Sequence, residues 1–341
     1  MQSVSLIGID LGKHTFHLHG QDKSGNAVFR KKVNRQQLVS FFATLNVCVV
    51  VMEACAGAHY MARKLATFGH QVKLISPQFV RPFVKSNKND FVDAEAICEA
   101  ASRPAMRFVT PKTEAQQTLS ALHRVRESLI RDRTKSSNQM HGFLLEFGVS
   151  LPVGPAVIAR LPTILADHEL PPRMIAILER LYDHYKYLSG QISEIDKEMR
   201  RQLADDDLGQ RLLTIPGVGP VTASVLAAEM GDGKQYGCSR DFAASIGLVP
   251  RQYSTGGRAN LLGISKRGDK NIRRLLVQCA RAYMQRVSRQ TGRLADWVRT
   301  LMIRRHSCVV ACALANKLAR IAWALATHDS RFDAEIAIKR V

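Results

Sequence analysis

The sequence predicts three parts: a mixed α/β domain at the N-terminus, a pair of long helices, and a mostly α-helical domain at the C-terminus. Three observations support this fold class. Apolar strand-like runs alternate with helical patterns up to about residue 112, two long amphipathic patterns follow, and Ala- and Arg-rich helical patterns close the chain. With 341 residues, the chain is long enough for two or three domains that each bury a hydrophobic core.

The N-terminal segment contains a meander of three strand-like runs and then two further runs, each preceded by a helical pattern. The strand-like runs cover residues 4–10, 15–21, 26–33, 47–53 and 71–77, and the helical patterns cover residues 36–45 and 58–68. A meander followed by β-α-β units is the strand order of an RNase H-like sheet. We therefore predict an RNase H-like domain over residues 1–112.

Residues 113–207 predict two long helices joined by a proline-rich linker. The first helix covers 113–147 and the second about 173–203, and the linker contains Pro152, Pro155, Pro162, Pro171 and Pro172. The apolar stripes comprise Leu119, Leu122, Leu129, Ile130 and Leu144 on the first helix, and Ile177, Leu181, Leu188, Ile192 and Ile195 on the second. These stripes predict an antiparallel coiled coil, within one chain or between chains, although a simple helical spacer fits the pattern equally well.

The remaining chain predicts a C-terminal domain over 208–330 and a tail over 331–341. Its stretch "IPGVGPVTA", residues 215–223, resembles a helix-hairpin-helix, in which Gly217 and Gly219 let backbone N–H groups approach a DNA phosphate. An ordinary corner between two packed helices is the alternative.

Positive charge dominates the composition. The net charge is +20, with +8 on residues 1–112, −2 on 113–207 and +14 on 208–341. Such an excess favours a polyanionic partner, most simply nucleic acid. An anionic membrane competes less well, because the basic residues are not gathered on one amphipathic helix, and no apolar stretch is expected to be long enough to span a membrane.

The cysteines and the N-terminus predict a cytoplasmic protein. The seven cysteines form no CxxC pair, which favours a reducing compartment over a disulfide framework or a zinc ribbon. Asp10 and Lys13 interrupt the early apolar run, so no signal peptide is expected.

Four carboxylates stand where an RNase H-like sheet needs metal ligands. Asp10 and Glu53 lie at the ends of two strand-like runs, and Asp90 and Asp93 lie three apart on a helical pattern after the last strand. Metal-assisted phosphoryl transfer requires such a convergence of acids. A helix cap at Asn89 or Asp90 and a solvated Asp93 are the plain alternative for the second pair. An actin-like ATPase is disfavoured, because no second Gly-rich phosphate loop precedes residue 112.

Three histidines follow the first acid, but they do not predict a metal site by themselves. His17 and His19 share one face of a strand, and His14 precedes them. No third ligand stands at a spacing that would complete a histidine site.

A Gly-rich segment near residue 254 places hydroxyl groups among cations. Ser254 and Thr255 precede two glycines, and the residues predicted to bind nucleic acid here are Arg251, Lys266, Arg267, Lys270, Arg273 and Arg274. A serine in this setting either binds a phosphate or attacks it, since cations stabilise both the alkoxide and the pentacoordinate phosphorus. From the residues alone, phosphate binding is the favoured alternative.

These motifs together resemble the DEDD transposases of insertion-sequence family 110/116/902, to which the pilin-gene invertases also belong. The resemblance runs nearly end to end and is carried by "GIDLGKH", "VMEACAGAHY", "KNDFVDAEAI", "TIPGVGPVTA" and "GLVPRQYSTGG…GISKRGDKNIRRLL". It implies a RuvC-like N-terminal domain, a coiled coil and a C-terminal transposase domain.

The resemblance also implies a mechanism. Mg²⁺ would be bound by Asp10, Glu53, Asp90 and Asp93, and a serine, by position Ser254, would attack DNA and form a transient 5′-phosphoserine bond. Thr255 and Ser265 are the competing hydroxyls. The family further implies a structured non-coding guide RNA, and dimers that assemble into tetramers in which one subunit's acids work with another's serine.

The sequence thus predicts a site-specific DNA recombinase of a mobile element that acts on donor and target DNA in the bacterial cytoplasm, at the nucleoid. The alternatives are a DNA invertase of the same family, a RuvC-like junction nuclease that only hydrolyses, and a non-catalytic nucleic-acid-binding protein. The last is disfavoured, because carboxylates beside bound phosphates weaken binding unless a metal ion neutralises them.

Overall fold

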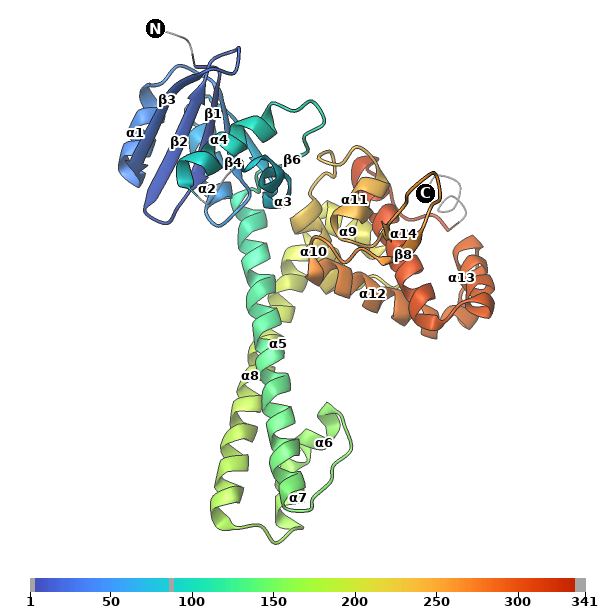
Figure 1. The fold of residues 1–341 in the computed structure, drawn as a ribbon. Helices are drawn as coiled ribbons and strands as arrows, with labels where there is room; N and C mark the ends of the chain where they lie inside the picture. The colour runs from blue at the N-terminus through green and yellow to red at the C-terminus, as the bar shows by residue number, and fades with distance from the viewer. Residues whose placement is uncertain (1–3, 86–88, 335–341) are drawn as a thin grey trace. The chain divides into compact units, whose positions relative to one another are not determined.

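The computed structural model describes residues 4–85 and 89–334. The chain folds into two compact units, residues 1–116 and residues 117–341. The mixed α/β character of the N-terminal part and the helical character of the rest are as the sequence predicts. Figure 1 shows the elements of each unit.

The first unit is built on a six-stranded mixed sheet with strand order β3-β2-β1-β4-β5-β6. The strands are β1 (Leu6–Leu11), β2 (Thr15–Gln21), β3 (Ala27–Asn34), β4 (Val49–Glu53), β5 (Gln71–Ile75) and β6 (Phe108–Val109). β1, β2 and β3 form an antiparallel meander, whereas β1, β4 and β5 are parallel. Five strands match the expected runs. The two-residue β6, which pairs with β5, is too short to leave a periodic signal.

Helices cover both faces of this sheet. α1 (Arg35–Thr44) and α2 (Ala58–Ala66) pack on the face that carries Ile7, Ile9 and Met52. α4 (Asp90–Ala101) packs on the opposite face with Val51 and Ile75, beside the short helices α3 (Pro77–Val80) and η1 (Arg81–Phe83). Because side chains alternate along a strand, every second residue of β1 and β4 faces α4.

Gly8 allows α4 to lie close against β1. A side-chain Cβ at this position would overlap the carbonyl oxygen of Ala94 and would lie 2.8 Å from the Sγ of Cys98. Glycine is therefore required where the helix crosses the strand, two residues before Asp10.

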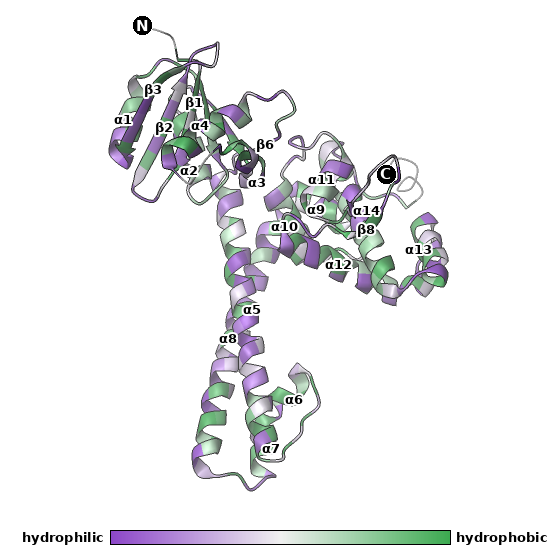
Figure 2. Cartoon of the chain, viewed as in Figure 1, coloured by the Kyte–Doolittle hydropathy of each residue, from purple (hydrophilic) through white to green (hydrophobic). Residues whose placement is uncertain are grey.

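The second unit begins with two long helices that confirm the predicted lengths. α5 (Glu114–Glu146) and α8 (Pro172–Ala204) are joined through α6 (Pro155–Ala159) and α7 (Leu161–Ala166). Their distal ends share a hydrophobic cluster with α6 and α7 that includes Met140, Leu144 and Leu178. Figure 2 shows hydrophobic and hydrophilic residues alternating along both helices. On α8, Leu178 is buried whereas the predicted stripe residue Ile177 is 44% exposed. Leu178, not Ile177, lies on the side of the helix that faces the hydrophobic cluster.

The buried face of α5 is partly polar, which the predicted leucine stripe did not anticipate. Ser120 donates a hydrogen bond to Glu229 at 2.7 Å, and His123 Nε2 lies 3.0 Å from Ser224 Oγ. Arg126 Nε donates to Asp196 on α8 at 2.5 Å. These polar groups are satisfied by long-range partners, so a polar face is buried where local periodicity predicts an exposed one.

The rest of the second unit is a helical core with one small hairpin. It contains α9 (Asp207–Leu213), α10 (Pro220–Met230), α11 (Ser239–Ser245), β7 (Pro250–Gln252), β8 (Leu261–Ile264), α12 (Lys270–Gln285), η2 (Val287–Arg289), α13 (Arg293–Arg304) and α14 (Ser307–Thr327). Leu212, Phe242, Leu276, Leu314 and Leu318 are among the side chains that form its core.

The expectation that no apolar stretch is long enough to span a membrane was wrong for α14. By length and composition this 21-residue helix qualifies, and half of its most apolar window is buried within the protein. Its buried residues, including Leu314 and Leu318, belong to the core cluster that also contains α11 and α12. A core helix of this kind satisfies the same criteria as a membrane span, so the finding is weak evidence for a membrane. All seven cysteines are free.

Candidate active site

Two of the four predicted acids lie at the carboxyl ends of neighbouring parallel strands. Ile9 of β1 pairs with Met52 of β4, so the next residues, Asp10 and Glu53, follow side by side at the ends of the two strands. Both side chains lie on the strand face that α4 covers, because Asp10 follows Gly8 by two residues and Glu53 follows Val51 by two residues. The carboxyl ends of parallel strands thus bring both acids to one edge of the sheet.

The other two acids lie on the first turn of α4. The side chain of Asn89 accepts a hydrogen bond from the backbone N–H of Phe91 at 3.0 Å and caps the helix. The cap fixes where the helix begins, and Asp90 and Asp93 then share the face that meets the sheet. The prediction that Asn89 caps this helix is therefore confirmed. A cap at Asn89 leaves both aspartates available for another role.

Several of these acids interact with one another. The pKa of Glu53 is raised by burial and then by the negative charges of Asp10 and Asp93. Asp10, His17 and Asp90 each offer a ligand atom, and these atoms all lie within 4.8 Å of one another. Carboxylates that raise each other's pKa are stabilised in the ionised form by a cation, and oxygen donors of this kind suit a hard divalent ion. The donor set therefore fits a divalent metal.

His17, which the sequence analysis considered only as part of a disfavoured histidine site, lies among these acids. Asp10 and His17 are direct partners in the antiparallel β1–β2 ladder, so their side chains project to the same face. His17 is 7% exposed, its Nδ1 lies 3.5 Å from Asp90 Oδ2, and its ring packs edge-on against Phe91. The short turn between β1 and β2 was the feature of the sequence that could have predicted this contact, because it fixes which residues of the two strands face each other.

Ser254 lies in the hairpin of β7 and β8, in the second unit. Its exposed Oγ accepts hydrogen bonds from the Nε2 of Gln252 at 2.8 Å and from the backbone N–H of Asn260 at 3.3 Å. The hairpin turns through Gly256 and Gly257, which both have positive φ angles and are bracketed by a bridge between Thr255 and Arg258.

The basic residues around the hairpin fall into two groups. Arg251, Lys266, Arg267 and Lys270 are exposed. Arg273 instead donates to the carbonyl oxygens of Ile246 and Arg267, and Arg274 forms an ion pair with Glu127 of α5 at 2.5 Å. Arg273 and Arg274 therefore bind other residues of the protein and help to hold its fold.

The stretch 215–223 forms the turn between α9 and α10. Gly217 has a φ of +83°, and a Cβ there would lie 2.7 Å from the carbonyl oxygen of Cys279, so this glycine is required by packing on α12. Gly219 precedes α10 and has open space around it. Both observations agree with a tight turn between two helices.

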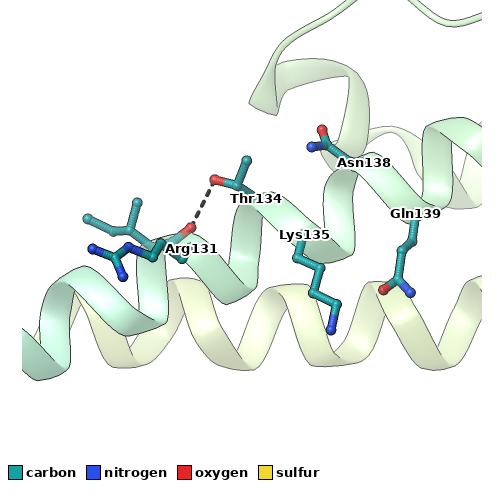
Figure 3. Close-up of a pocket in the computed structure, with 6 residues that line it drawn as sticks. Arg131, Thr134, Lys135, Asn138 and Gln139 are labelled. Carbon is teal, nitrogen blue, oxygen red and sulfur yellow. Dashed lines mark hydrogen bonds between the residues drawn. The ribbon is translucent and has the colours of Figure 1, made fainter.

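A hollow on α5 contains none of the candidate residues. It is lined by Ile130, Arg131, Thr134, Lys135, Asn138 and Gln139 (Figure 3). Thr134 donates to the carbonyl oxygen of Ile130 at 2.9 Å, and Arg131 pairs with Glu127. This hollow is an exposed stretch of a long helix and does not collect groups with catalytic chemistry.

Two family models match the chain. The model described as "Transposase IS116/IS110/IS902 family" matches residues 209–295, which include the β7–β8 hairpin. A transposase model for DEDD proteins of IS110 elements matches residues 7–148, which include all four acids.

Individual relatives agree with these matches. The transposase for insertion sequence element IS1328 of Yersinia enterocolitica is 65% identical over 97% of this chain and 99% of that protein. The transposase for IS1111A of Coxiella burnetii is 42% identical over 97% of this chain and 92% of that protein. The pilin gene-inverting protein of Moraxella lacunata is 23% identical over 82% of each chain. The chain therefore belongs to the IS116/IS110/IS902 family of transposases, and it is a DNA transposase of the insertion-sequence type that is related to the pilin-gene invertases.

Proposed function

We propose that this protein cuts and rejoins the DNA of a mobile insertion sequence through a covalent bond between DNA and Ser254, with Mg²⁺ held by Asp10, Glu53, Asp90 and Asp93. The observation that carries the proposal is the gathering of these acids from β1, β4 and α4 at one edge of the sheet. The strand order β3-β2-β1-β4-β5 supports an RNase H-like, RuvC-like assignment for this unit.

The four acids act as an anionic cradle for the cation. Asp10 and Glu53 are fixed by the sheet, whereas Asp90 and Asp93 are fixed by the first turn of α4, so the cradle is preorganised. The cation supplies charge stabilisation at the phosphodiester that is cut. Without it, carboxylates would repel a DNA phosphate.

Ser254 supplies the nucleophile in this proposal. Its Oγ forms a bond to phosphorus, the bond from phosphorus to the 3′ oxygen breaks, and the hydroxyl proton ends on that 3′ oxygen. The two hydrogen bonds that Oγ accepts stabilise the developing alkoxide. Because the phosphoserine ester keeps the energy of the broken phosphodiester, rejoining requires no ATP.

Surroundings favour Ser254 over the competing hydroxyls. Ser265 is half-buried, and its backbone N–H donates to Val249 at 2.8 Å, which holds it in a packed loop. Thr255 is exposed, and the hydrogen bonds from Gln252 and Asn260 go to the Oγ of Ser254 and not to the hydroxyl of Thr255.

We also propose the partners that the resemblance implies. The net charge of +20 supports binding of donor DNA, target DNA and a structured guide RNA, with Gly217, Gly219 and the exposed basic residues near the hairpin as contacts. Dimers that assemble into tetramers would let the acids of one subunit work with the serine of another. Transposition is favoured over inversion, because relatives from insertion sequences are 65% and 42% identical and the inverting protein is 23% identical.

The test uses a nicked DNA substrate that traps covalent intermediates. Wild type is expected to give an adduct that survives denaturant and maps to residues 252–258, and Ser254→Ala is expected to give none. Ser254→Ala should still bind nucleic acid, because one neutral hydroxyl contributes about 1 kcal/mol beside many charge contacts.

A second arm tests the acids. Asp10→Asn and Asp93→Asn are expected to abolish strand transfer in Mg²⁺ while nucleic-acid binding persists, since each change removes a ligand but adds no bulk. An adduct on Thr255 or Ser265 would reassign the nucleophile. Cleavage without any adduct would favour the hydrolytic nuclease, and full recombination by either aspartate variant would refute the metal site.

A further inference from the structure

We propose that His17 is a nitrogen ligand of the divalent cation at the acidic edge of the sheet, together with Asp10 and Asp90. The inference rests on the metal site of the proposed function and adds a residue to it. It assigns to this site a mixed oxygen and nitrogen donor set in place of carboxylates alone.

The backbone places His17 beside Asp10. β2 pairs antiparallel with β1, and Asp10 and His17 are direct partners in that ladder. β4 pairs with β1 on the other side and brings Glu53 to the same edge. His17 and Glu53 thus flank Asp10 on neighbouring strands, and α4 brings Asp90 over them.

The side-chain geometry is that of a ligand. The imidazole is 9% exposed although it lies beside carboxylates, and its Nδ1 faces Asp90 Oδ2 at 3.5 Å. The ligand atoms of Asp10, His17 and Asp90 all lie within 4.8 Å of one another, so one ion can contact all three with small side-chain adjustments. The edge contact with Phe91, at a ring-centroid distance of 4.7 Å, restrains the ring in this orientation.

A nitrogen donor changes the metal preference of the site. First-row transition ions, Mn²⁺ included, accept an imidazole nitrogen more readily than Mg²⁺, which prefers oxygen ligands and keeps several waters. The inference therefore predicts that Mn²⁺ binds more tightly than Mg²⁺, and that this preference depends on His17.

The test measures metal binding to the full-length protein without DNA. Mn²⁺ is added below stoichiometry, and electron spin-echo spectroscopy detects coupling from a directly bound ¹⁴N nucleus. Wild type is expected to show this coupling, and His17→Phe is expected to lose it while keeping the ring contact with Phe91. Calorimetric titration is expected to show at least a roughly tenfold loss of Mn²⁺ affinity in His17→Phe, with a smaller loss for Mg²⁺.

His14→Phe is the matched control, because His14 lies in the same β1–β2 turn but is exposed and outside the cluster. It is expected to behave as wild type. His17→Gln provides a second variant if the phenylalanine impairs folding, which circular dichroism will reveal.

Asp10→Asn separates this inference from the proposed function. If Asp10→Asn keeps full Mn²⁺ affinity, the metal site itself is refuted. If Asp10→Asn loses affinity while wild type lacks the ¹⁴N coupling, or His17→Phe retains it, only the assignment of His17 as a ligand is overturned.

Discussion

Single residues in this protein act through partners that are remote in sequence, and His123 gives the clearest measurable case. His123 is 7% exposed and contacts Ser224, and burial, followed by the charge of Arg126, lowers its pKa to about 4. An unfolded chain protonates this histidine near pH 6.5, whereas the folded chain does so near pH 4. Between these values the unfolded state binds the extra proton, so the free energy of unfolding falls as the pH falls. We expect His123 to contribute a loss of about 2 kcal/mol between pH 7 and pH 5.

The measurement compares urea unfolding of wild type and His123→Asn at both pH values. The variant cannot titrate in this range, so its loss is expected to be smaller than that of wild type by about the same amount. Equal pH dependence of the two proteins would show that His123 is accessible to protons in the folded state.

At the scale of elements, the crossing of α4 over β1 decides whether four acids form one site. Gly8 permits that crossing, since a Cβ would overlap Ala94 and lie 2.8 Å from Cys98 Sγ. We expect Gly8→Ala to lower the free energy of unfolding by about 2 kcal/mol and to reduce strand transfer, because α4 must move and carries Asp90 and Asp93 with it. Chemical denaturation and a strand-transfer assay measure the two effects.

Gly142→Ala is the matched control for this prediction. Gly142 lies within α5, where a Cβ meets nothing within 4 Å. Alanine favours a helix over glycine by about 1 kcal/mol, so this variant is expected to be slightly more stable and fully active. A Gly8→Ala protein as stable and active as Gly142→Ala would contradict the role given to the α4 crossing.

At the scale of the whole molecule, charge governs the interaction with nucleic acid. With a net charge of +20, binding is expected to release counterions, and affinity is expected to fall by roughly a thousandfold between about 50 and 200 mM salt. The structure distinguishes which cations contribute. Lys270 is exposed, whereas Arg274 is paired with Glu127. We expect Lys270→Gln to reduce the slope of log affinity against log salt by about one, and Arg274→Gln to leave it unchanged.

Fluorescence anisotropy with duplex DNA over a salt series measures both slopes. A flat affinity over this range would refute a polyanion as the main partner. Equal slopes for the two variants would show that Arg274 leaves Glu127 when nucleic acid binds.

The sequence alone determined many of the elements and the positions of the four acids. Periodicity is a local property, so five strands, the two long helices and the strand-end positions of Asp10 and Glu53 were predictable from it, and the motifs were sufficient to predict the family. Only the tertiary structure decided which side chains meet. His17 lies beside the acids because of its register in the β1–β2 ladder. His123 is buried against Ser224 of α10, and Arg274 forms an ion pair with a glutamate that lies 147 positions away in the sequence. Such contacts depend on how elements pack, and packing energy is shared among residues that are distant in the chain, so no local pattern encodes it.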